Sequence, residues 1–120
     1  MFESVVAGMR LRFGDNPANI VEAIGSSIAS QERTIDQLRE AARVRSFGGV
    51  RESAHHFKTP AGYLYLSQVE LLSRDVEALA IAKEELAFVR AVQLADEMAV
   101  VNEAMKRYGA MLQAPERDAP

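Results

Sequence analysis

The two histidines of this chain are adjacent, and they lie in the stretch ESAHHFKTPAGY at residues 52–63. At about 100° per residue, a helix places four of its residues on one face roughly 100° wide: His55, Lys58, Thr59 and Gly62. Apolar residues gather on the opposite face, namely Val50, Ala54, Phe57, Ala61 and Leu64. That face must turn to a core, so we expect His55 to point into water.

This polar face is suited to phosphoryl transfer. A solvated imidazole is largely neutral at cytosolic pH and acts as a nucleophile. Lys58, one turn away, offers a positive charge to an anion held at the ring. Small neighbouring residues let the backbone of another protein come close. The residues therefore predict a face that accepts a phosphoryl group from a protein partner and passes it on.

The same stretch resembles the signature of histidine-containing phosphotransfer (HPt) domains, the relay modules of multistep two-component signalling. That signature is roughly A-H-x-[LF]-K-G-[SP]-[SA]-G, and the matching residues are Ala54, His55, Phe57, Lys58, Ala61 and Gly62. The resemblance implies that His55 is the phosphoacceptor, Lys58 the supporting cation and Gly62 the residue that gives the partner access. It also implies response-regulator receiver domains and a hybrid sensor kinase as partners. The Mg²⁺ of the reaction would belong to the receiver, so the chain needs no cofactor of its own.

The chain departs from this signature after the lysine. Thr59 stands where a glycine is usual, and a bulkier residue near Tyr65 replaces another glycine. The Thr59 hydroxyl either hydrogen-bonds the phosphoryl group or crowds the partner. Pro60 frees the carbonyl of His56 and should bend the helix. Two alternatives therefore stay open, a helical module that docks receivers without accepting phosphate and an unrelated helical scaffold.

Other residues near the motif have secondary roles. Arg51, with Arg43 and Arg45, either complements an acidic receiver surface or forms a solvated cluster. We expect His56 to be a partly buried ring beside the site. Glu52 either orients one of the two rings or is solvated. The expected partner-binding residues are Arg51, Thr59 and Gly62.

Composition and missing motifs exclude several classes of protein. The chain has 120 residues, 48% of them hydrophobic and 26% charged, as in a single globular domain. It has no cysteine, and its net charge of −3 argues against nucleic-acid binding. We find no membrane span or secretory signal, which fits a cytoplasmic protein.

Enzymatic and metal-binding roles also lack support. Adjacent helical histidines diverge by about 100°, so they cannot close on one metal ion. Neither a Gly-x-Ser-x-Gly elbow nor a glycine-rich phosphate loop is present. Without an ATP site we expect no autokinase activity, and the chain would be a stoichiometric phosphoryl carrier rather than an enzyme.

Helical spacing runs from end to end and predicts the elements that position the motif. A short helix over 1–13 precedes one from Pro17 to about Val44, which Asn16 caps and which Gly25 could break. Residues 46–49, with paired glycines, should end it, and a third helix should run from Val50 into the mid-sixties.

The remaining elements complete the predicted fold. A helix from Ser67 should bury Val69, Leu72, Val76 and Leu79 or Ala80, and residues 83–85 are either a tight connection or a polar helical turn. The last helix should bury a stripe that comprises Phe88, Val92, Ala95, Ala99, Asn102 and Met105, with Val89, Leu94, Met98 and Val101 beside it, and fray at Gly109. We therefore predict an all-α, up-and-down four-helix bundle with a short extra N-terminal helix over residues 1–113. It would be monomeric, with a disordered tail at 114–120.

Overall fold

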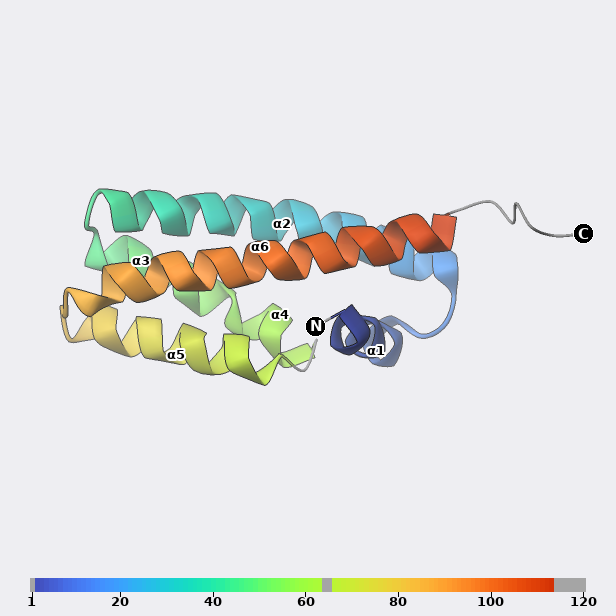
Figure 1. Ribbon diagram of the computed structural model, residues 1–120, viewed down its shortest axis with the longest axis horizontal. Coiled ribbons are helices and arrows are strands. Elements are labelled where there is room, and N and C mark those ends of the chain that lie inside the picture. Colours follow the sequence, from blue (N-terminus) through green and yellow to red (C-terminus); the bar gives the residue numbers. More distant parts are fainter. Residues whose placement is uncertain (1, 64–65, 114–120) are drawn as a thin grey trace, which may run out of the picture.

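A computed structural model describes residues 2–63 and 66–113, and every regular element within these ranges is a helix (Figure 1). The helices are α1 (Phe2–Phe13), α2 (Pro17–Arg43), α3 (Phe47–His56), α4 (Lys58–Tyr63), α5 (Ser67–Ile81) and α6 (Leu86–Gln113). The all-α prediction is confirmed. The predictions for Leu64, Tyr65 and the tail at 114–120 lie outside the described residues.

The two long helices, α2 and α6, lie side by side along most of the molecule (Figure 1). Helix α3 packs against α2 and α5, α5 lies below α6 in this view, and α1 lies across one end, against α6 and α2. The core between these helices is apolar, and its largest fully buried side chains include Phe57, Leu38, Leu94 and Met98. Burial of these faces, rather than helix propensity, supplies most of the stability of such helices.

The start of α2 follows the prediction. The side-chain oxygen of Asn16 accepts hydrogen bonds from the backbone N–H groups of Ala18 and Asn19 at 3.0 and 3.4 Å, and Pro17 occupies the first turn. These bonds satisfy amide groups that have no partner within the helix. The helix then continues through Gly25 without a break.

The connection between α2 and α3 differs from the prediction. The chain turns at Val44 and Arg45, where Arg45 adopts a positive φ of 59°. The paired glycines lie in the first turn of α3, which Ser46 caps by accepting a hydrogen bond from the Gly49 N–H. A Cβ atom on Gly49 would lie 2.9 Å from the Cβ of Ala41. The glycine is therefore explained by close packing of α3 on α2 and not by a helix stop.

A second correction concerns α3 and α4, which were predicted as one helix. The helix ends at His56, the Phe57 N–H bonds to the carbonyl of Ala54 at 3.2 Å, and α4 begins at Lys58. Pro60 has no N–H to donate to the carbonyl of His56, and its ring clashes with that carbonyl in a continuous helix. The proline thus breaks the helix, a stronger effect than the predicted bend.

Helix α5 begins at the predicted residue and buries Val69, Val76 and Ala80, with Leu72 and Leu79 partly covered. The segment that follows is a tight connection, with Lys83 at a φ of 56°, and not a polar helical turn.

The predicted stripe of α6 is mostly buried: Phe88, Ala95, Asn102 and Met105 are buried and Ala99 is partly buried. The prediction was wrong at Val92, which is 45% exposed, while Ala91 is fully buried. Of the residues expected beside the stripe, Leu94, Met98 and Val101 are fully buried and Val89 is exposed. Gly109 does not fray the helix. It is buried within α6, where a Cβ atom would come within 3.6 Å of Ile24.

Candidate functional site

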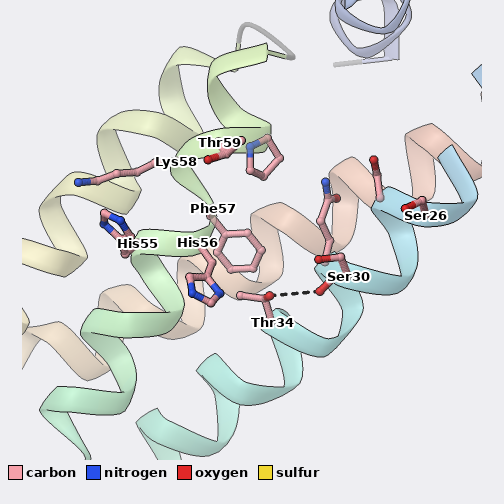
Figure 2. Close-up of a pocket in the computed structure, with 11 residues that line it drawn as sticks. Ser26, Ser30, Thr34, His55, His56, Phe57, Lys58 and Thr59 are labelled. Carbon is pink, nitrogen blue, oxygen red and sulfur yellow. Dashed lines mark hydrogen bonds between the residues drawn. The ribbon is translucent and has the colours of Figure 1, made fainter. Parts of the chain in front are cut away.

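His55 lies in the last turn of α3, and its side chain is 65% exposed, as predicted. Figure 2 shows the side chains of His55 and Lys58 on the same side of the chain, pointing away from α2. The helix break separates them, because Lys58 is the first residue of α4. The two residues therefore share a face as predicted, although they do not share a helix.

A third residue, Glu77 of α5, joins them. Its Oε2 atom lies 3.2 Å from Nδ1 of His55 and 3.0 Å from Nζ of Lys58. The Glu77 side chain is only 18% exposed. Glu77 was not predicted as a site residue, because it lies 22 positions after His55 on another helix and no local spacing connects the two.

The contact with Glu77 fixes the chemistry of the imidazole. A carboxylate accepts hydrogen bonds, so a neutral ring in this contact carries its proton on Nδ1. The lone pair then resides on Nε2, the other ring nitrogen. The contact with Glu77 therefore favours the neutral tautomer of His55 whose lone pair lies on Nε2.

Electrostatics bind the three side chains together. The hydrogen bond from the Lys58 ammonium lowers the pKa of Glu77, and the bond to His55 lowers it further, although burial acts in the opposite direction. Glu77 is therefore ionised at neutral pH. Its carboxylate contacts both the Lys58 ammonium and the His55 ring, so the ion pair keeps Lys58 next to the imidazole.

The other predicted site residues lie at exposed positions near His55, Lys58 and Glu77. Arg51 is exposed on α3, one turn before His55, and Thr59 is exposed on α4. Gly62 is also exposed, and a Cβ atom there would meet nothing within 4 Å. Glu52 is exposed, and the carboxylate that orients the His55 ring is Glu77 instead.

Two expectations about neighbouring residues are corrected. His56 is exposed rather than partly buried. Arg43 and Arg45 are not unpaired cations as in a solvated cluster: Arg43 pairs with Glu40 on its own helix, and Arg45 pairs with Glu85 in the α5–α6 connection.

The surface is hollowed on two sides of the histidines. One hollow of about 590 Å³ lies between α2 and the α3–α4 break, and its lining includes Ser30, Gln31, His56 and Thr59. A second hollow of about 390 Å³ lies beside α3, where Arg51, His55 and Glu77 contribute to the wall. The predicted partner-binding residues Arg51 and Thr59 thus line separate depressions on either side of the histidine pair.

Comparison of the chain with protein-family models, with curated proteins and with solved structures finds no match. Within residues 2–63 and 66–113, no three histidine, aspartate or glutamate side chains are grouped so that they could hold a metal ion. No helix in the described part of the chain is long and apolar enough to cross a membrane.

Proposed function

We propose that this chain is a histidine phosphotransfer protein, which accepts a phosphoryl group on Nε2 of His55 and passes it to another protein. The observation that supports the proposal best is the arrangement around Glu77. One carboxylate holds Nδ1 of an exposed histidine at 3.2 Å and a lysine ammonium at 3.0 Å. The result is an accessible nucleophilic nitrogen beside a positioned cation.

The transfer step follows from this geometry. The Nε2 lone pair attacks the phosphorus of an aspartyl phosphate on a receiver domain, a P–N bond forms, and the P–O bond to the aspartate carboxylate breaks. Nδ1 keeps its proton, so the phosphorylated ring is cationic and Glu77 stabilises that charge. Lys58 lies where it can offset the charge of the phosphoryl oxygens. Reversal of these steps delivers the group to a second receiver.

The wider proposal concerns the setting of this reaction. The chain is a monomeric, cytoplasmic carrier with the up-and-down four-helix architecture of HPt domains and a short extra N-terminal helix. Its partners are response-regulator receiver domains and a hybrid sensor kinase. Because the receiver supplies the acidic pocket and Mg²⁺, most of the transition-state stabilisation comes from the partner, and the chain is a stoichiometric carrier without autokinase activity.

Transfer from a phosphorylated receiver tests the proposal directly. A panel of receiver domains, including those encoded beside this chain's gene, is phosphorylated with acetyl phosphate and mixed with the purified chain. We expect an acid-labile, base-stable phosphate on the wild-type chain and on a His56→Gln variant. The His55→Gln variant should carry none.

The other outcomes separate the alternatives. Phosphate that persists in His55→Gln but disappears in His56→Gln would move the site to the neighbouring ring. Receivers that bind the wild-type chain and transfer nothing would make the protein a docking module. Receivers that neither bind nor transfer would leave a helical scaffold in which the His-x-x-Lys pattern is accidental.

A further inference from the structure

The proton on Nδ1 of His55 matters for the release of a phosphoryl group as well as for its capture. When a P–N bond at Nε2 breaks, the bonding electron pair stays on that nitrogen. A ring with a proton on Nδ1 then leaves as neutral imidazole, whereas a ring without it would leave as an imidazolate anion. Neutral imidazole is the better leaving group, so the protonation state of Nδ1 decides how readily phosphohistidine gives up its phosphoryl group.

Glu77 lies where it keeps that proton on the ring. Its Oε2 atom is 3.2 Å from Nδ1 of His55, and its side chain is only 18% exposed. Hydrogen bonds from Lys58 and His55 lower the pKa of Glu77, so the carboxylate is charged throughout the neutral pH range. A carboxylate at this distance favours the protonated form of a titratable ring, and its partial burial limits screening by salt.

The charges on α3 itself have a smaller effect on the ring. Arg51 and Glu52, about one turn before His55, line the hollow beside the ring and have opposite charges. His56, the other titratable ring, lines both hollows and adds a charge only when it is protonated. None of these three is the hydrogen-bond partner that the structure gives to Nδ1.

The helices packed on α3 bring few other charges to the ring. From α4, Lys58 disfavours a further cation, but a phosphoryl group adds negative charge next to both. Among the described residues, α2 contributes only uncharged side chains to the two hollows beside the histidines, and α6 contributes none. From α5, Glu77 is the carboxylate in direct contact with Nδ1. Because Nε2 lies on the other side of the ring, a phosphoryl group there leaves this contact in place.

We propose that Glu77 is the positioning residue that keeps phosphorylated His55 protonated on Nδ1, and so keeps its phosphoryl group ready for transfer across the neutral pH range. This inference rests on the proposed phosphotransfer function and adds to it the residue that sets the lifetime of the phosphohistidine. In the transfer, the P–N bond breaks and a P–O bond forms to a carboxylate oxygen of the receiver. The electron pair returns to Nε2, and the Nδ1 proton stays on the ring. The chain is then a short-lived relay and not a store of phosphoryl groups.

This role predicts a specific pH profile. At a pH low enough to protonate the phosphorylated ring without help, removal of Glu77 changes nothing. At higher pH only the wild-type ring keeps its proton, so the rates of P–N cleavage in the two chains diverge. A residue that only stabilised the fold would change the rate by the same factor at every pH.

Chemical phosphorylation tests the inference without a receiver. Phosphoramidate labels the wild-type chain, Glu77→Gln and the control Glu70→Gln. The control makes the same change about two turns earlier on α5, where Glu70 pairs with Arg74. ³¹P NMR then gives the titration midpoint of the phosphorylated ring and the rate at which phosphate is lost to water between about pH 6 and pH 9.

We expect the midpoint to fall by about one pH unit in Glu77→Gln, because a charged acceptor forms a hydrogen bond about twice as strong as a neutral one. Above both midpoints the loss of phosphate should slow about tenfold, and well below both it should match the wild-type rate. Glu77→Asp keeps the charge on a shorter side chain, so its midpoint should lie between the two. Glu70→Gln should behave like the wild-type chain.

An unchanged midpoint in Glu77→Gln would overturn the inference, and so would slowing by the same factor at every pH. Either result, with normal transfer from a phosphorylated receiver, would leave the proposed function intact. If receivers transfer nothing while the midpoints differ as expected, the relay fails and the effect of Glu77 on the phosphorylated ring stands. If phosphoramidate leaves His55 unlabelled, both proposals fail together.

Discussion

Glu77 is the residue whose removal should most directly alter His55. In Glu77→Gln the charged acceptor of the Nδ1–H bond is lost, so we expect part of the ring population to move its proton to Nε2. Hydrogen bonds to charged groups contribute about 1.5–3 kcal/mol, so transfer to His55 should slow by about tenfold or more. The ¹⁵N chemical shifts of the ring measure the tautomer, and transfer from a phosphorylated receiver measures the rate.

Asp75→Asn is the control for that variant, because it removes one negative charge from the same helix and Asp75 pairs with Arg90 instead of a histidine. We expect this variant to keep the wild-type tautomer and rate. Equal slowing in the two variants would mean that the general charge of α5 matters and that Glu77 does not orient the ring.

The lowered pKa of Glu77 predicts how stability depends on pH. A carboxyl group whose pKa is lower in the folded state stabilises the fold above its unfolded pKa, about 4.3, and this contribution disappears as the pH falls through the folded pKa. Lys58→Met removes the largest cause of the shift. Urea unfolding at pH 6 and pH 3 should therefore show a smaller loss of stability in Lys58→Met than in the wild-type chain. An equal loss in both would contradict the coupling.

At the scale of the elements, the two neighbouring glycines of α3 should respond in opposite directions to the same substitution. In Gly49→Ala the new Cβ meets that of Ala41 at 2.9 Å and approaches Ser46 Oγ at 3.1 Å. The first contact is with an atom fixed to the backbone of α2, so we expect a loss of about 1–3 kcal/mol of unfolding free energy. Gly48→Ala meets open space and should add about 0.5–1 kcal/mol.

Urea denaturation of both variants decides this point. A gain of stability in Gly49→Ala would show that α3 can move away from α2 at little cost. It would also support the original prediction, in which the paired glycines end a helix because of their backbone flexibility.

For the whole molecule, α6 is a central element, since it packs against α1, α2, α3 and α5. Asn102, in the middle of α6, is 2% exposed, and neither polar atom of its side chain has a hydrogen-bond partner. Replacement by leucine, which has a similar volume, removes the cost of the buried amide. We expect Asn102→Leu to add about 1–2 kcal/mol and to raise the Tm by about 4 °C or more, in one cooperative transition.

Asn19→Leu, at an exposed position of α2, is the control. Its change in Tm measures the effect of the higher helix propensity of leucine, which is subtracted from the change in Asn102→Leu. Thermal unfolding followed by circular dichroism compares the two variants. A lower Tm in Asn102→Leu would indicate that a buried water satisfies the amide in solution.

The sequence by itself determined the helices and the exposure of His55. Apolar spacing and the Asn16 cap identified the long helix α2, and the opposition of polar and apolar residues around His55 predicted which histidine faces water. These features are readable because they depend on residues within a few turns of one another.

Tertiary structure decided what completes the site. Glu77 reaches His55 only because α5 packs on α3. The same is true of the need for glycine at position 49, which depends on how closely α3 packs on α2. Contacts of this kind join residues far apart in the chain, and no local spacing in the sequence records them.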